Sequence, residues 1–293
     1  MKTKILKTLA VLLCFGVFKT ITAQTQEISG GFQNPESVIA IGNKIFVSNM
    51  GAKLDPTAKD GDGFISLVSR RSGKVIQEKF ITGLNSPKGM KVGWGKLIVT
   101  DVDKVLVYNI HTKKKIQEVD LSKEGVTYAN DLAVGAGVLL VSSTDNNCIY
   151  RVRPGGKVSE LLTKVDLPGA NGLRRGGGKL FVANYGKDGH PDGSFGTVNR
   201  VTKKFTLLQA GGNYDGITKI GKRLVVSDWV NPDENKGRVV VYNLRTKKSH
   251  TLDMGRPING PADLYADRIM RTVYIPAMRE NKVLAVSFKS VKQ

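Results

Sequence analysis

The stretch ANGLRRGGGKLFVAN, residues 170–184, sets the pattern of the whole chain: a polar start, a short strand, a glycine-rich turn and a second strand that ends in small polar residues. Five more segments follow this pattern. They are PESVIAIGNKIFVSN (35–49), PKGMKVGWGKLIVTD (87–101), ANDLAVGAGVLLVSS (129–143), YDGITKIGKRLVVSD (214–228) and PADLYADRIMRTVYIP (261–276). The second residues of successive copies lie 41 to 52 residues apart. Because such a period is typical of one four-stranded propeller blade, the sequence predicts an all-β, six-bladed β-propeller.

Each copy is followed by material for two more strands. After the first copy, FISLVSR and KVIQEKF flank the basic turn RSG, and no stretch of the chain shows sustained helical periodicity. The last copy provides only three clear strands, so we expect the segment TQEISGGF, residues 25–32, to add the missing outer strand and close the ring. A different all-β sandwich is the competing architecture, but it would not explain the regular period.

The N-terminus has the pattern of a signal peptide. Lys2, Lys4 and Lys7 precede or interrupt an apolar run that ends at Phe18, and small residues lead to Ala23. We therefore expect residues 1–23 to be a signal peptide and residues 24–293 to form the propeller domain. The apolar run is too short for a confident membrane span, so we expect a periplasmic or secreted protein with no span after cleavage.

Charge and cysteine content narrow the function classes. The chain has a formal net charge of +20 and two cysteines, and residues 1–23 contain one of these cysteines and four lysines but no acid. The single remaining Cys148 excludes a disulfide scaffold and a cysteine-based zinc site. Positive charge permits a polyanion as partner but does not specify one, and lysines in turns are usually only solvated. We expect a small-molecule substrate and no nucleic acid.

In a propeller the first strand of each blade lines the central channel, so equivalent residues form a ring at its mouth. The ring is Glu36, Lys88, Asn130, Asn171, Asp215 and Ala262. Carboxylate and amide oxygens suit a hard cation such as calcium. The alternative is that Asn and Asp at turn ends only satisfy nearby backbone groups.

The alternation of strand direction also predicts which loops share a face. The long loops 50–63, 184–196 and 229–237 should rim the same opening as the ring. Tyr185, Asp228 and Trp229 stand at or just beyond the ends of second strands, so we expect them near the pocket as substrate-binding residues.

The ring motifs resemble a known family. Glu36 after Pro35, then Asn130-Asp131, Asn171-Gly172-Leu173 and Asp215-Gly216 occur in the order typical of the senescence-marker-protein/gluconolactonase (regucalcin-like) family, six-bladed propellers that include metal-dependent lactonases. The resemblance implies a divalent metal, most simply calcium, on Glu36, Asn171 and Asp215. It also implies that Asp215 is the general base and that Asn130 contacts the substrate or the outer shell of the metal.

Two positions depart from that family. Tyr128 stands where the family often has an arginine, and Lys88 adds an ammonium to the ring. Either side chain could hold substrate oxygens, although Lys88 could instead pack its stem and extend its ammonium to solvent. We expect a metal-dependent hydrolase of lactones, including sugar lactones, or of related small esters. The alternative is a non-catalytic propeller that binds a ligand or protein, with a structural metal or none.

Overall fold

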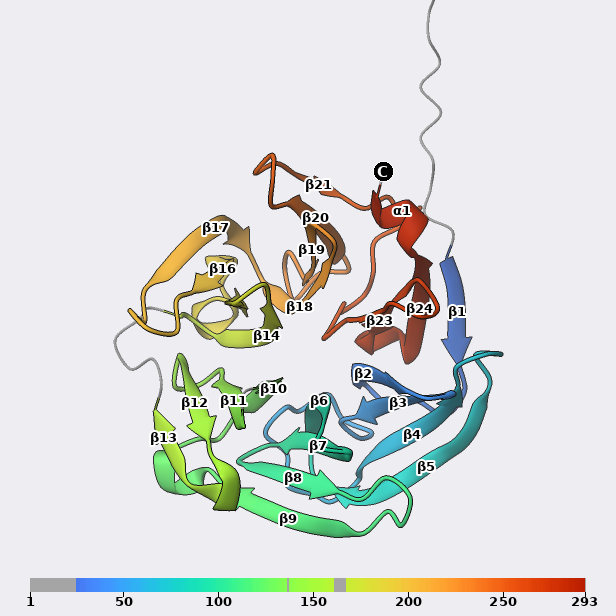
Figure 1. The fold of residues 1–293 in the computed structure, drawn as a ribbon. Helices are drawn as coiled ribbons and strands as arrows, with labels where there is room; N and C mark the ends of the chain where they lie inside the picture. Colours follow the sequence, from blue (N-terminus) through green and yellow to red (C-terminus); the bar gives the residue numbers. More distant parts are fainter. Residues whose placement is uncertain (1–24, 136, 161–166, 293) are drawn as a thin grey trace, which may run out of the picture.

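The structure, a computed structural model, describes residues 25–135, 137–160 and 167–292. Six four-stranded antiparallel sheets are arranged around a central axis (Figure 1), which confirms the six-bladed propeller that the repeat predicts. The expected signal peptide and its cleavage site lie outside the described residues. No helix of the described part has the length and apolar character needed to cross a membrane.

The blades follow one another along the chain. Blade 1 contains β2 (Pro35–Ile41), β3 (Lys44–Asn49), β4 (Gly63–Ser69) and β5 (Val75–Leu84). Blade 2 contains β6 (Pro87–Gly93), β7 (Lys96–Asp101), β8 (Lys104–Tyr108) and β9 (Lys115–Asp120). Blade 3 contains β10 (Ala129–Gly135), β11 (Val138–Ser143), β12 (Cys148–Val152) and β13 (Val158–Glu160).

The second half of the ring has the same organisation. Blade 4 contains β14 (Ala170–Gly176), β15 (Lys179–Asn184), β16 (Gly193–Val198) and β17 (Phe205–Gly212). Blade 5 contains β18 (Tyr214–Ile220), β19 (Arg223–Asp228), β20 (Arg238–Asn243) and β21 (Ser249–Thr251). Blade 6 contains β22 (Tyr265–Asp267), β23 (Thr272–Ala277), β24 (Lys282–Ser287) and β1 (Thr25–Ser29). The helical segments are short: 3₁₀ turns at Ser122–Glu124, Pro154–Gly156, Lys187–Gly189 and Met278–Glu280, and α1 (Phe288–Lys292).

The ring closes between its first and last blades. The N-terminal strand β1 pairs with β24 on the outer side of blade 6, with Ile28 opposite Val283, as the sequence predicts (Figure 1). Near the channel, the Ser37 hydroxyl of blade 1 donates to the Asp263 carboxylate of blade 6 at 2.7 Å. Strand pairing at the outer rim and a hydrogen bond near the channel therefore both close the ring at blade 6.

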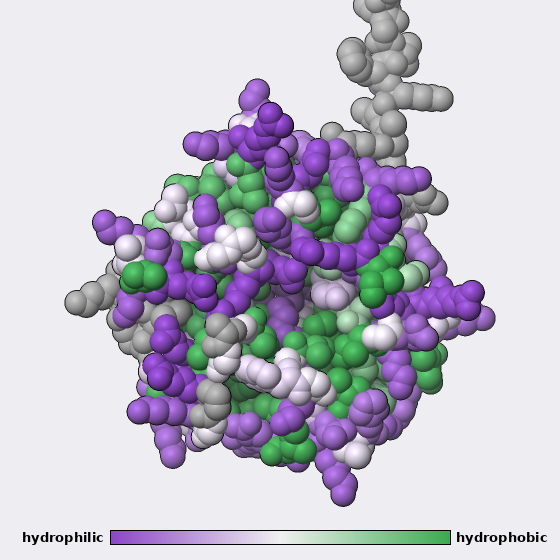
Figure 2. Space-filling view, viewed as in Figure 1, coloured by the Kyte–Doolittle hydropathy of each residue, from purple (hydrophilic) through white to green (hydrophobic). Residues whose placement is uncertain are grey.

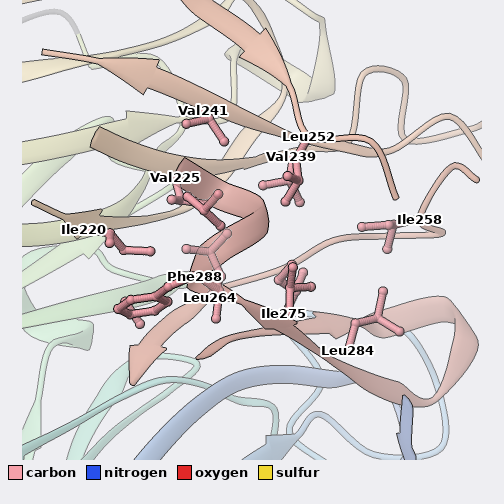
Figure 3. Packing of buried hydrophobic residues seen from close by; sticks show 14 of the residues in the cluster. Ile220, Val225, Val239, Val241, Leu252, Ile258, Leu264, Ile275, Leu284 and Phe288 are labelled. Atoms are coloured by element: carbon pink, nitrogen blue, oxygen red, sulfur yellow. The ribbon is translucent and has the colours of Figure 1, made fainter. Parts of the chain in front are cut away.

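Apolar side chains fill the spaces between blades. Figure 3 shows one such cluster, in which Val225 and Val239 of blade 5 pack with Ile275 and Leu284 of blade 6. The face drawn in Figure 2 is mostly hydrophilic at its circumference, with hydrophobic residues scattered between. Because burial of aliphatic side chains is the main favourable term in folding, these interfaces between blades hold the ring together.

Each innermost strand of the first five blades begins with a β-bulge. The register between the first and second strands shifts between Pro35 and Ser37 in blade 1, and at the corresponding point in blades 2 to 5. The residues that the shift leaves out of the ladder are Glu36, Lys88, Asn130, Asn171 and Asp215, together with the residue after each of the last four. A bulge re-aims a side chain, so the same irregularity in these five blades frees their ring residues from the sheet.

Candidate functional site

Hydroxyl groups on the second strands fix these bulges in place. Ser142 of β11 accepts the backbone N–H of Asp131 at 2.9 Å and donates to the Asn171 carbonyl of the next blade at 2.6 Å. The same pair of bonds links Ser48 to Ser37 and to Lys88. The Ser or Thr in VSN, VTD, VSS and VSD thus ties Lys88, Asn130, Asn171 and Ala262 to the preceding blade, whereas VAN in blade 4 has no hydroxyl at this position.

Glycines after the ring residues allow the innermost strands to approach closely. A Cβ added to Gly172 would lie 2.2 Å from the Asp215 carbonyl oxygen, and one added to Gly216 would lie 2.5 Å from the Leu264 nitrogen. Since real Cβ atoms do not approach so closely, only glycine fits at these points. The Asn-Gly and Asp-Gly pairs of the sequence therefore serve the packing of the channel wall rather than a tight turn.

Five ring residues line one cavity of about 610 Å³ at the channel mouth: Glu36, Lys88, Asn130, Asn171 and Asp215. Ala262 is fully buried and does not contribute to the lining. The loops expected on this face also contribute, through Met50, Leu54 and Pro56, Tyr185–Gly189, and Trp229 and Pro232. The cavity lies within the range of small-molecule sites, which is roughly 300 to 1,000 Å³.

The floor of this cavity has an unusual set of buried oxygens. Within the described part of the chain, no hydrogen-bond donor reaches Oε2 of Glu36, Oδ1 of Asn130, Oδ1 of Asn171 or Oδ1 of Asp215. Buried polar atoms normally have a partner, and each unpartnered one costs about 1 to 3 kcal/mol. The alternative in which Asn and Asp only satisfy nearby backbone groups is therefore wrong for these oxygens of Asn130, Asn171 and Asp215.

Burial and mutual repulsion act together on the two carboxylates. Burial raises the pKa of Glu36 well above its usual value, and the nearby Asp215, Asp263 and Asp131 carboxylates raise it further. Burial likewise raises the pKa of Asp215 well above its usual value, with Asp263 and Asp131 adding to the effect. A positive charge placed among these oxygens would relieve both effects.

Trp229 holds one side of Asp215. The indole Nε1–H donates to Oδ2 of Asp215 at 3.1 Å, and Trp229 is itself only 7% exposed. Its ring packs edge-on to Tyr185, with centroids 6.0 Å apart, and Arg279 lies over its other side at 5.2 Å. The sequence placed Trp229 near the pocket, but it could not show this bond to the carboxylate.

Lys88 is buried rather than solvated. It is 1% exposed, and its Nζ donates to the carbonyl oxygens of Pro56 and Ser86 at 2.5 and 2.9 Å. The ammonium also lies 4.9 Å from the ring centroid of Tyr128. Burial lowers the pKa of Lys88 to about 8, despite the opposing effect of Glu36. The alternative in which the ammonium reaches solvent is wrong.

Asp228 does not line the cavity, so its expected role near the substrate needs correction. Its carboxylate accepts the backbone N–H groups of Asn213 and Val230 and the Nε–H of Arg238. Asp101, at the same position in blade 2, accepts the N–H groups of Asn85 and Ser86. The acid at the end of the second strand therefore binds the backbone just before the first strand of the same blade.

A second group of charges lies beside the cavity floor. Nζ of Lys91 approaches Asp131 Oδ1 at 2.6 Å and Asp263 Oδ2 at 3.4 Å. Asp131 and Asp263 each follow a ring residue. This shared position in the repeat is the feature of the sequence that could have predicted that the two carboxylates lie near each other. Although burial lowers the pKa of Lys91, the two carboxylates raise it above its usual value, so Lys91 balances much of their charge.

The possible metal ligands at this site are not all acidic side chains. Nowhere in the described ranges do three or more His, Cys, Asp or Glu side chains gather as metal ligands. The four unpartnered oxygens come instead from two carboxylates and two neutral amides. Hard cations such as calcium accept both kinds of oxygen, and the residues present therefore fit such an ion.

Comparison with solved structures identifies similar folds. Virginiamycin B lyase from Staphylococcus aureus, in a complex with quinupristin, matches with a TM-score of 0.59 and 16% identity over 90% of this chain and 99% of its own. The likeness is one of fold. Hydrazine synthase from Kuenenia stuttgartiensis matches with a TM-score of 0.59 and 15% identity over 87% of this chain and 77% of its own.

A third match comes from a nidogen/laminin complex, with a TM-score of 0.56 and 17% identity over 74% of this chain and 80% of the matched chain. No protein-family model and no curated protein sequence matches this chain. Because similar propellers occur in enzymes and in a protein complex, the fold alone does not assign an activity.

Proposed function

We propose that this protein is a metal-dependent hydrolase of lactones or related small esters, and that the reaction takes place in the cavity at the channel mouth. The observation that supports it is the set of four buried, unpartnered oxygens on Glu36, Asn130, Asn171 and Asp215, all lining one cavity. Such an arrangement is costly to the fold unless a ligand compensates it. The resemblance of the ring motifs to the gluconolactonase family supports the same conclusion.

Glu36, Asn171 and Asp215 would hold the metal, with Asn130 beside it. Calcium is the best candidate, because its ligands are carboxylate and amide oxygens. When bound, such an ion polarises an ester carbonyl and stabilises the negative charge that develops on its oxygen.

Asp215 is suited to accept a proton from the attacking water. Trp229 donates to Oδ2, and within the described residues no donor reaches Oδ1, so one oxygen of this carboxylate would bind the metal and the other would accept the proton. Trp229 would also keep the carboxylate from rotating during proton transfer.

The walls of the cavity would bind the organic part of the substrate. Tyr185 and Trp229 provide an aromatic wall, and Met50 and Met278 add apolar surface. Tyr128 lies beside the Lys88 ammonium and would replace the arginine typical of the family. This lining favours a substrate with an apolar part as well as oxygens, so small aromatic or alkyl esters belong in the assay beside sugar lactones.

The proposal is tested with a panel of lactones and small esters, assayed with purified protein, with chelator, and after calcium is restored. We expect hydrolysis that the chelator abolishes and calcium recovers. Asp215→Asn should lose the activity, whereas Asp233→Asn, at an exposed position in the loop 229–237, should retain it. Activity that survives the chelator would contradict the metal requirement.

The alternative is a non-catalytic propeller that binds a ligand or protein across this face. Tyr128 in place of the family's arginine favours it, because substrate contacts of the family are then missing. Binding of calcium without hydrolysis of any member of the panel would support this alternative. We also propose that residues 1–23 direct the protein to the periplasm or outside the cell, with Gln24 as the mature N-terminus.

A further inference from the structure

A second cavity, of about 330 Å³, lies between blades 2 and 3. Its walls are aliphatic side chains, each 9% exposed or less: Ile98, Val105, Val107, Val119, Leu139 and Val152. An apolar cavity of about 150 Å³ is already large enough to stay dry and bind a small apolar molecule. The cavity beside these two blades is more than twice that size.

This cavity opens on the face opposite the channel-mouth site. Strand β7 runs from Lys96 to Asp101, and Asp101 pairs with Pro87 beside the ring residue Lys88. Lys96 and the preceding turn residue Trp94 thus lie at the other end of the blade. Arg153 and Gly155, which follow β12, line the same opening. The two cavities share no lining residue.

The turn at this opening requires a positive φ at its first residue, and a tryptophan, Trp94, occupies that position. It has φ +52° and is 58% exposed. The first residue of the equivalent two-residue turn is glycine in blades 1, 4 and 5: Gly42, Gly177 and Gly221, with φ of 55°, 59° and 58°. A bulky residue at positive φ is strained, and such strain is often kept for function. Glycine would adopt this positive φ without strain, so we infer that the indole has a role other than forming the turn.

The opening also carries unbalanced positive charge. Lys96 and Arg153 line it together with Gln117, and among the residues whose placement is described no carboxylate does. Within the ranges that the structure describes, neither Lys96 nor Arg153 forms an ion pair or a side-chain hydrogen bond; the acid nearest in sequence to Gln117, Glu118, is paired with Lys104 and Lys115. An apolar slot with two available cations at its mouth is complementary to a molecule with an apolar body and an anionic head.

We propose that this cavity binds an apolar monocarboxylate, specifically a medium-chain fatty acid. Its alkyl chain would lie between the blades against the valine and leucine side chains, and its carboxylate would lie at Lys96 and Arg153. Trp94 would cover the chain where it leaves the slot. The volume is near the lower end of ligand sites, roughly 300 to 1,000 Å³, which suits a ligand of this size. The site is independent of the proposed hydrolase activity.

The test is calorimetric titration of the purified protein with hexanoate, octanoate and decanoate below their micelle concentrations. Each buried methylene should tighten binding about fourfold, until the chain exceeds the cavity. The chain has two tryptophans, and Trp229→Phe leaves Trp94 as the single fluorescent reporter. Its emission should shift to shorter wavelength on binding. Absence of saturable binding to the unmodified protein would overturn the proposal.

Three variants locate the site. The double variant Lys96→Gln/Arg153→Gln should weaken decanoate binding about tenfold or more, in line with the loss of charged hydrogen bonds. Lys44→Gln, at the same repeat position in blade 1, should bind as the unmodified protein does. Trp94→Gly should weaken binding and raise Tm together, since glycine relieves the strained turn. A purely structural role for Trp94 predicts the opposite change in Tm.

The outcomes that contradict the proposal are equally specific. Decanol binding as tightly as decanoate would exclude recognition of the carboxylate. Unchanged decanoate affinity in both the double variant and Trp94→Gly would exclude this cavity as the site. Val107→Phe, which fills the slot, should abolish binding; if it does not fold, the other two variants still decide the question.

Discussion

Calcium should stabilise this protein through the channel-mouth oxygens, and Asp215→Asn should remove most of that effect. Glu36 and Asp215 are both buried, and burial and their neighbouring carboxylates raise the pKa of each. Without a cation, the fold therefore either protonates these groups or bears their repulsion. A ligand that binds only the folded protein at 100 times its Kd stabilises it by about 2.7 kcal/mol.

For a domain of this size, 1 kcal/mol corresponds to a change in Tm of about 2 to 4 °C. Saturating calcium should thus raise Tm by roughly 5 to 11 °C in a thermal scan. Asp215→Asn should raise the Tm of the metal-free protein, because it removes a buried negative charge, and should show little further rise with calcium. Asp233→Asn, exposed in the following loop, should respond as the unmodified protein does. An unchanged Tm at millimolar calcium, or an undiminished response of Asp215→Asn, would falsify the reasoning.

Three further predictions follow from particular contacts. Because the pKa values of Glu36 and Asp215 are raised above their usual 4.5 and 3.8, the folded metal-free protein binds more protons than the unfolded chain, so its stability should fall as pH rises above about 4; denaturant titrations across pH would show a flat profile if this is wrong. Trp229→Phe should keep the apolar contacts but lose the bond to Asp215, lowering kcat about tenfold with little change in KM, and an unchanged kcat would contradict the positioning role. Ile28→Ala should cost about 2 to 5 kcal/mol in chemical denaturation, since Ile28 is 4% exposed in the closing strand; a loss below 1 kcal/mol, by the same principle, would mean that β1 does not hold the ring.

The architecture was predictable because every blade repeats one pattern. The spacing of the six segments gave the number of blades, and the missing strand of the last copy indicated that residues 25–29 close the ring. The same repeat placed Glu36, Asn171 and Asp215 at one end of the channel, because equivalent positions in a ring share a face. That the bulges free these residues from the sheet was not visible in the sequence, since register shifts depend on how strands pair.

Individual roles at the site were harder to predict than positions. Asp228 and Trp229 are adjacent in sequence. The Asp228 carboxylate accepts hydrogen bonds from backbone N–H groups, whereas the Trp229 indole donates a hydrogen bond to Asp215. The recurrence of an acid at Asp101 was a signal that Asp228 is structural. Burial of the Lys88 ammonium against two carbonyls had no such signal, because these oxygens belong to Pro56 and Ser86 in irregular segments.

The cavity between blades 2 and 3 illustrates a different limit. Its valine and leucine residues follow the normal pattern of strand interiors and belong to the buried core, so nothing in the sequence indicates a cavity beside them. Trp94, in a turn position that is glycine in blades 1, 4 and 5, departs from the repeat. Departures of one copy from its fellow copies are therefore the most informative residues in a repeat protein.

The most direct test of the central claim is a crystal structure of the protein grown with calcium, with a matched Asp215→Asn crystal as control. The account predicts one ion at the channel mouth, with side-chain oxygens of Glu36, Asn171 and Asp215 at about 2.3 to 2.6 Å. The control should show no ion there. Well-ordered density in which these three oxygens are too far apart to touch one ion, or are bridged only by water at saturating calcium, would contradict the metal site and the hydrolase proposed on it.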